Sequence, residues 1–160
     1  KAANPGWEPA VFLTNTCASR LFLSVLAGDA GDGVFTSSNV VDTPDPANAS
    51  NEGVATFVEA YNAAGLAGDL QTTSVGWHSG EVLANILNTA LESGTLSRKS
   101  IIEAARNLEF TPSLAREGVV YKMAGEEDPF PFESLVVLQW SHADQLFTQI
   151  GDVITDFESS

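Results

Sequence analysis

Hydrophobic residues follow two different spacings at the beginning of the chain, and these predict a strand, a helix and a second strand. Residues 10–13 form a short unbroken apolar run, which is typical of a strand buried on both faces. Apolar residues then recur at i, i+1, i+4 and i+5, which predicts a helix that ends at Gly28. Residues 33–37 return to a strand pattern. The helical stripe consists of Leu21, Phe22, Val25 and Leu26.

Three further helices are predicted in the middle of the chain. Residues 54–61 place apolar side chains at i, i+3, i+4 and i+7, and this helix stops near Gly65. Residues 82–91 repeat the pattern over a longer helix that ends at Gly94. The third helix covers residues 97–108. An aspartate followed by proline in the connector before these helices supplies a helix start signal.

The hydrophobic spacing changes again near the carboxyl end. Residues 118–123 and 134–140 are rich in residues that favour strands, and an acidic loop with two prolines, 124–133, separates them. The order is therefore strand, helix, strand, three helices and two strands. This order predicts an α/β layered fold.

Composition excludes several classes of protein. The chain has 160 residues, 21 acidic against 7 basic, and a formal net charge of −14. Such a charge repels phosphate backbones, so we expect no nucleic-acid partner. No apolar run approaches the roughly 18 residues of a membrane-spanning helix. The single cysteine, Cys17, forbids an internal disulfide and disfavours a cysteine-based metal site.

The common catalytic and phosphate-binding motifs are missing from the sequence. The glycine cluster at 28–33 follows a helix and precedes a strand, which is the wrong order for a phosphate loop. His78 and His142 have no acid at ligand spacing, and the acids at 126–128 lack the spacing of a calcium loop. Cys17, at a helix start, is expected to be a buried or half-buried structural thiol, with a nucleophile as the alternative. We therefore expect no enzyme activity, no catalytic residue, no bound metal and no cofactor.

Four segments in order resemble one known family. Residues 6–38, 45–65, 76–91 and 96–108 together resemble the type I periplasmic-binding-protein family, in particular the branched-chain amino-acid and amide group of ABC-transporter solute receptors. The resemblance implies three-layer parts of a two-lobed fold, with mostly parallel sheets flanked by helices. It covers only the carboxyl half of such a receptor, so it implies a missing N-terminal half of the same protein.

The resemblance also implies how the chain divides between two lobes. Residues 1–35 would belong to the second, ligand-binding lobe, and residues 36–38 would cross the hinge. Residues 39–120 would belong to the first lobe, and 121–133 would form a second crossover with the acidic loop. Residues 134–160 would complete the second lobe, in which Trp7 and Trp140 would pack.

The resemblance places a ligand site in the cleft between the lobes. The turn after the first strand would border the ligand, and its backbone N–H groups would suit an anionic group. In amino-acid-binding members an acidic residue in this turn holds the ammonium group, but here Thr16 stands in its place. An amide or a carboxylate is therefore at least as suitable a ligand as an amino acid. The turn residues are Thr14, Asn15, Thr16 and Cys17.

Two more residues are implied at or near the ligand. Ser37 lies on the expected crossover strand. Trp77, expected just before the long helix, would stack on the ligand or wedge one lobe against the other.

The function implied is an extracytoplasmic solute-binding component of an ABC importer, either periplasmic or a cell-surface lipoprotein. Its partners would be a small polar metabolite and a membrane permease. The alternative is a ligand-sensing regulatory domain on the same fold. A hydrolase is a third hypothesis, but the sequence offers no activated nucleophile for it.

Overall fold

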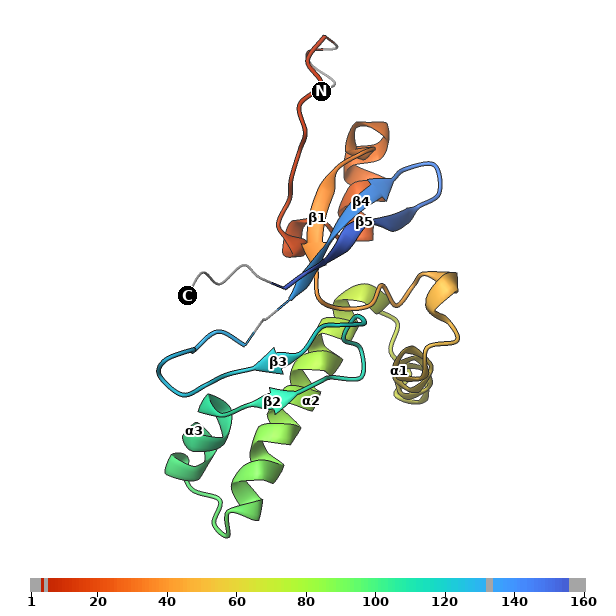
Figure 1. Ribbon diagram of the computed structural model, residues 1–160. Helices are drawn as coiled ribbons and strands as arrows, with labels where there is room; N and C mark the ends of the chain where they lie inside the picture. The colour runs from red at the N-terminus through yellow and green to blue at the C-terminus, as the bar shows by residue number, and fades with distance from the viewer. Residues whose placement is uncertain (1–3, 5, 132–133, 156–160) are drawn as a thin grey trace. The chain divides into compact units, whose positions relative to one another are not determined.

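The computed structural model describes residues 4, 6–131 and 134–155, and the chain divides into two compact units (Figure 1). Unit 1 is Lys1–Ser38 with Leu135–Val153, and unit 2 is Asn39–Ser134 with Ile154–Ser160, each within the described residues. The chain therefore leaves unit 1 once and returns to it after building unit 2. The divisions lie next to the crossovers expected from the sequence. That the units are lobes of a receptor stays a prediction.

Unit 1 is built on a three-stranded sheet. Its strands are β1 (Phe35–Ser38), β4 (Leu135–Ser141) and β5 (Leu146–Ile154), with β4 between the other two (Figure 1). β1 and β4 are antiparallel, and Phe35 pairs with Gln139 while Ser38 pairs with Val136. Both strands were expected from the sequence, β1 from 33–37 and β4 from 134–140.

The expectation of mostly parallel sheets is not met in the described part of the chain. The reason lies in the connections: the chain leaves unit 1 at Ser38 and re-enters beside it at Val136, which makes β1 and β4 antiparallel. A parallel contact does occur at the predicted first strand, where Phe12 bridges to Phe35. Phe35 N–H donates to the Val11 carbonyl at 2.8 Å, and Leu13 N–H donates to the Phe35 carbonyl at 2.8 Å. Residues 10–13 thus extend the sheet beside β1 over a single bridge.

The helix expected before Gly28 is present, but its winding changes along its length. A π-helical segment, Phe22–Ala27, follows a short α-helical start and leads into a 3-10 turn, Gly28–Gly31. Leu23 and Ala27 face the core of unit 1. The apolar stripe that predicted the helix lies on its exposed side, and its four side chains are 50% to 70% exposed: Leu21, Phe22, Val25 and Leu26.

The core of unit 1 lies between this helical segment and the sheet. Trp140 is almost fully buried and its ring contacts that of Phe147, with the ring centroids 4.9 Å apart. Trp7, which was expected to pack in the same lobe, is 59% exposed because the segment before residue 10 lies outside the sheet. The buried members of this core are Ala18, Leu23, Val34, Val136, Leu138, Trp140 and Phe147.

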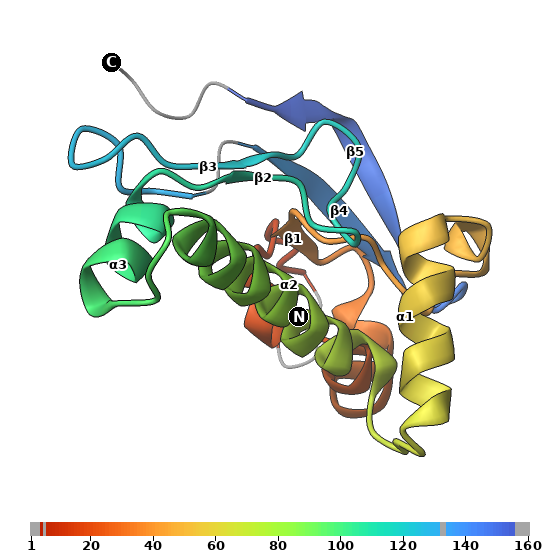
Figure 2. The ribbon, with the colours of Figure 1, turned by 90° about the horizontal axis from the view of Figure 1, so that it is seen from below.

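Unit 2 contains the three longer helices and a small two-stranded sheet. The helices are α1 (Glu52–Ala63), α2 (Leu70–Glu92) and α3 (Arg98–Arg106). The strands β2 (Glu109–Phe110) and β3 (Tyr121–Lys122) are antiparallel, so only part of the expected strand 118–123 forms. In Figure 2, α3 lies beside one end of α2, and β2 and β3 run along the same side of α2.

Side-chain caps explain where the helices of unit 2 begin. The carboxylate of Asp69 accepts the N–H of Thr72 at 2.7 Å, and Asn51 caps α1 in the same way. Ser97 and Ser100 form a reciprocal capping box at α3. The cap at Asp69 starts α2 well before residue 82, where the apolar stripe begins. Trp77 therefore lies inside α2 and not before it.

Two apolar clusters form the core of unit 2. One gathers around Phe57 and Leu114, and the other around Val119 and Tyr121.

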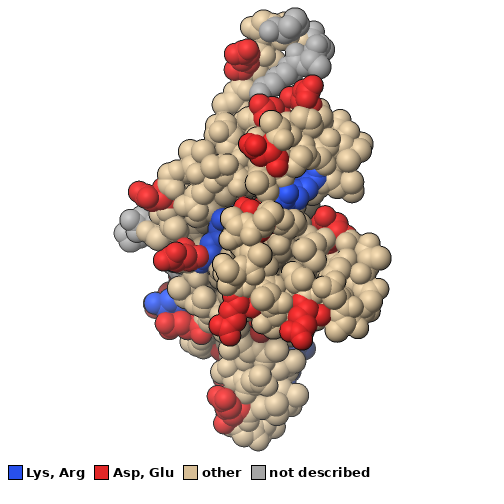
Figure 3. All heavy atoms as spheres, turned by 90° about the vertical axis from the view of Figure 1, so that its right-hand side faces the viewer, with Lys and Arg blue, Asp and Glu red and all other residues tan. Residues whose placement is uncertain are grey.

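No helix in the described part of the chain is both long enough and apolar enough to cross a membrane. Acidic side chains are scattered over the face seen in Figure 3, with Lys and Arg at only a few places between them.

Two helical glycines give a matched test of this packing. A Cβ at Gly53 in α1 would lie 2.0 Å from the Ser113 carbonyl oxygen, whereas one at Gly80 in α2 would meet nothing within 4 Å. We expect Gly53→Ala to lower the unfolding free energy by about 1–3 kcal/mol through overpacking. Gly80→Ala should raise it by about 0.5–1 kcal/mol because alanine is the better helix former. Urea unfolding followed by circular dichroism measures both, and effects of the same sign would contradict the α1 packing.

Candidate functional site

The polar turn of unit 1 follows the predicted first strand. It contains the 3-10 turn Asn15–Cys17, preceded by Thr14 in an extended conformation. The N–H of Cys17 donates to the Thr14 carbonyl at 2.9 Å, which closes the turn, and the buried Ala18 attaches it to the core. All four side chains of the turn are exposed. The turn thus presents two hydroxyls, an amide and a thiol to solvent.

Ser37 lies close to this turn. The 3-10 turn contacts β1. Phe12 pairs with Phe35 in a parallel bridge, so residues 13 and 14 continue in the same direction as β1. Ser37 is half-buried. Five of the six residues predicted for the ligand site, the turn residues and Ser37, therefore lie on neighbouring elements of unit 1. That they bind a ligand stays a prediction.

The turn has the features of a binding surface rather than of a nucleophilic centre. Cys17 is a free, exposed thiol. His142, the histidine of unit 1, is engaged elsewhere, with Nε2 at 3.3 Å from the Asp29 carboxylate and its backbone N–H on Asp32. A cysteine nucleophile needs a base within hydrogen-bond reach. The expectation of a buried or half-buried thiol is wrong, because Cys17 is exposed on the turn. No histidine base pairs with it in unit 1 either, so nothing in the described residues makes it a nucleophile.

Trp77, the sixth predicted residue, lies in unit 2. Its ring packs edge-on against Phe57, with centroids 5.8 Å apart, and its Nε1–H donates to the Ser113 hydroxyl at 3.3 Å. These contacts make Trp77 part of the packing of α1 against α2. A ligand contact for it stays a prediction.

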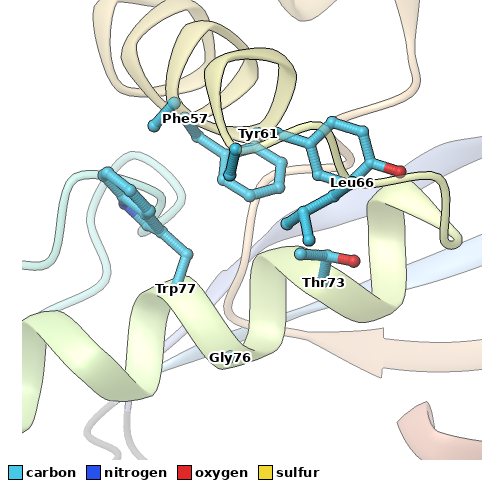
Figure 4. A pocket seen from close by; sticks show the side chains of 8 residues that line it. Phe57, Tyr61, Leu66, Thr73, Gly76 and Trp77 are labelled. Atoms are coloured by element: carbon cyan, nitrogen blue, oxygen red, sulfur yellow. The ribbon is translucent and has the colours of Figure 1, made fainter.

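Trp77 also lines a hollow between α1 and α2 that the sequence analysis did not identify. Its volume is about 270 Å³ and its walls are almost entirely apolar (Figure 4). The Tyr61 hydroxyl is held outside it by the Gly68 carbonyl at 2.5 Å. The apolar stripe of α1 is the sequence feature that could have indicated this hollow, but such a stripe predicts an ordinary core-facing side of a helix just as well. The lining residues are Phe57, Ala60, Tyr61, Ala64, Leu66, Thr73, Gly76 and Trp77.

Other candidate chemical groups are accounted for by local contacts. Glu126 in the acidic loop pairs with Arg106 at 3.1 Å, and both side chains are largely exposed. Among the described residues, no group of three or more histidine, cysteine or acidic side chains could hold a metal ion. Burial lowers the pKa of Arg116, and Asp42 and Asp45 act in the opposite direction.

Comparison with known proteins shows a likeness of fold. No protein-family model and no curated protein matches the sequence. The fold is similar to a crystal structure of a branched chain amino acid ABC transporter from Thermus thermophilus with bound valine, with a TM-score of 0.78. The likeness covers 98% of this chain and 42% of that chain, at 14% sequence identity. It supports the predicted α/β class and fold family.

We expect Trp77 and Cys17 to differ sharply in their effect on stability. Trp77→Ala removes the contact with Phe57 and the hydrogen bond to Ser113, and should lower the unfolding free energy by about 2–4 kcal/mol. Cys17→Ser changes an exposed turn side chain and should stay within about 0.5 kcal/mol. Chemical unfolding followed by circular dichroism avoids the loss of tryptophan signal. If Trp77→Ala left the unfolding free energy unchanged, Trp77 would not contribute to the packing of α1 against α2.

Proposed function

We propose that the chain is part of a solute-binding component of an ABC importer that captures a small polar metabolite in a cleft between two lobes. The fold likeness over 98% of the chain carries this proposal. The division into two units supports it, because the chain passes between them at both ends of unit 2. In such proteins, function is affinity coupled to hinge motion. We place this component outside the cytoplasm, with a membrane permease as its partner.

The ligand surface in this proposal includes the turn of unit 1 together with Ser37. In open α/β sheets, ligands bind at the carboxyl ends of the strands. The turn follows residues 10–13, which run parallel to β1. The exposed side chains of Thr14, Asn15 and Thr16 supply neutral hydrogen-bonding groups.

The composition of the turn favours a ligand that is not held through an ammonium group by this part of the protein. No acidic residue lies between Phe12 and Gly28. The hydroxyl of Thr16 is neutral, so it cannot form the ion pair with an ammonium group that a carboxylate forms. The similar structure has bound valine. For this chain we propose that an amide or a carboxylate is at least as suitable a ligand as an amino acid.

We also propose that a further part of a longer receptor chain covers the exposed helix face of unit 1. The similar structure has more than twice the length that this chain matches. Four large apolar side chains on one helix face, each at least half exposed, form an apolar patch of the kind that marks interaction sites.

Ligand-binding measurements test the proposed function, and they should use the natural protein in its full length. A panel of amino acids, amides and small carboxylates should contain a ligand whose affinity falls about 5- to 150-fold in Asn15→Ala, from about 1–3 kcal/mol of lost buried hydrogen bonding. The thermal midpoint without ligand should not change. Val75→Ala, on an exposed position of α2, is the matched control.

Two results would contradict this assignment. If no member of the panel bound, the solute-binding role would be lost. If valine bound tightly and Thr16→Ala left its affinity unchanged, the inferred ligand class would be wrong. Uptake that depends on a co-expressed permease separates the importer from the alternative, a ligand-sensing regulatory domain.

Sedimentation velocity tests the proposed cover of the helix face. We expect the 160-residue chain alone to self-associate, because water-exposed apolar area drives association. Val25→Lys with Leu26→Lys should abolish the association. Leu83→Lys, at an apolar position of unit 2 that is also more than half exposed, should leave the association unchanged. A wild-type chain that stays monomeric at high concentration would contradict the cover.

A further inference from the structure

Three side chains from distant parts of the sequence meet in a buried cluster inside unit 2. His78 comes from α2, Tyr121 from β3, and Asn39 is the first residue of unit 2. His78 is 6% exposed and Tyr121 is 4% exposed. The Asn39 side-chain amide donates to the Tyr121 hydroxyl at 2.6 Å, and that hydroxyl is also hydrogen-bonded to His78 Nε2. The rings of His78 and Tyr121 are in contact, with centroids 4.8 Å apart.

Asn39 joins this cluster to the segment that follows β1. Val41 N–H donates to the Leu114 carbonyl at 2.8 Å, and Arg116 N–H donates to the Asn39 carbonyl at 3.0 Å. The Arg116 side chain adds a bond from Nε to the Val40 carbonyl at 2.9 Å. These backbone contacts hold the segment to residues 114–116. The side chain of Asn39 is its hydrogen-bonded link to Tyr121, and through Tyr121 to α2.

The cluster suits a neutral imidazole and not a protonated one. His78 Nδ1 is buried and has no hydrogen-bond partner among the described residues. In the neutral ring Nε2 accepts the Tyr121 O–H, so Nδ1 carries the ring proton and one buried donor has no acceptor. Protonation adds a positive charge and turns Nε2 into a second donor, so the Tyr121 O–H loses its acceptor. The Nε2–H of the protonated ring would compete with the Asn39 amide for the same Tyr121 oxygen.

The charged and titratable groups around His78 do not remove this conflict. Glu81 lies one turn along α2, but its carboxylate accepts the Ser113 N–H at 3.0 Å. Burial lowers the pKa of His78, and the negative charge of Glu81 offsets this only in part. Burial also raises the pKa of Tyr121, so the phenol stays uncharged. On the other side of Asn39, Arg116 donates from Nε to the Val40 carbonyl and lies within the electrostatic influence of Asp42 and Asp45.

We propose that His78, Tyr121 and Asn39 form a proton-sensitive latch. With neutral His78, the Tyr121 hydroxyl holds Asn39, and with it the start of unit 2, to α2. Protonation of His78 places a second donor on that hydroxyl and releases the Asn39 side chain. The latch lies entirely within unit 2 and does not depend on the proposed ligand.

The direction of the pH effect follows from proton linkage. The pKa of folded His78 lies below its ordinary value of 6.5, so the unfolded chain binds the proton more readily. The contribution of neutral His78 to the stability of unit 2 is complete above pH 6.5. It is lost progressively as the pH falls from there toward the pKa of the folded state.

Nuclear magnetic resonance of the isotope-labelled 160-residue chain tests the latch directly. The sequence has two histidines, so the rings of His78 and His142 can be followed separately during a pH titration. We expect His78 to titrate with a midpoint below 6.5 and the Asn39 side-chain amide signals to shift with the same midpoint. In Tyr121→Phe, the Asn39 signals should no longer follow His78. Asn39 signals that ignore His78 in the wild type, or still follow it in Tyr121→Phe, would overturn the proposal.

A second variant keeps the test decisive if Tyr121→Phe does not fold. Asn39→Ala removes the competing donor, so the Tyr121 oxygen can accept from protonated His78 and the His78 midpoint should rise. An unchanged or lower midpoint would overturn the latch. His142→Asn, in unit 1, is the matched control and should leave the His78 midpoint where it was. A shift of that midpoint in the control would show that the titration senses net charge and would also overturn the proposal.

Discussion

The antiparallel pairing of β1 with β4 is the constraint on which the rest of the chain depends. Ser38, where the chain leaves unit 1, pairs with Val136, where it returns. This ladder brings together the two ends of the segment 39–134, which makes up most of unit 2, so that this segment folds as one insertion between the two parts of unit 1. It also sets the direction of β4 and so places the buried Trp140 in the core beneath the helical segment. Without the ladder, unit 1 would be two separate pieces of chain.

Features that depend on neighbouring residues could be predicted from the sequence. The apolar stripes around Phe57 and Ile86, with stop signals at Gly65 and Gly94, indicate two of the helices in unit 2, and the structure confirms both. The third helix is equally local, since Ser97 caps it within its own first turn. The same local rules missed the beginning of α2, because its first turns carry polar residues and no apolar stripe.

Features that depend on distant pairing could not be predicted. The antiparallel register of β1 depends on a partner strand on the far side of unit 2. The stripe at Leu21 predicted a helix correctly, but periodicity alone does not say which face the core will cover. In the candidate site, the position of the polar turn could be predicted because it comes directly after a predicted strand. The contact of His78 with Tyr121 is set by how α2 packs on β3, and no spacing in the sequence encodes it.

The exposed thiol of Cys17 makes the polar turn chemically distinct from the rest of the molecule. It is the single cysteine of the sequence, and it lies on the surface next to Ala18, which anchors the turn in the core. A thiol-reactive fluorophore would therefore attach at one position without any engineering of other sites. The label would sit beside Thr14 and Ser37, where its emission would report changes in polarity around the turn as solutes are added.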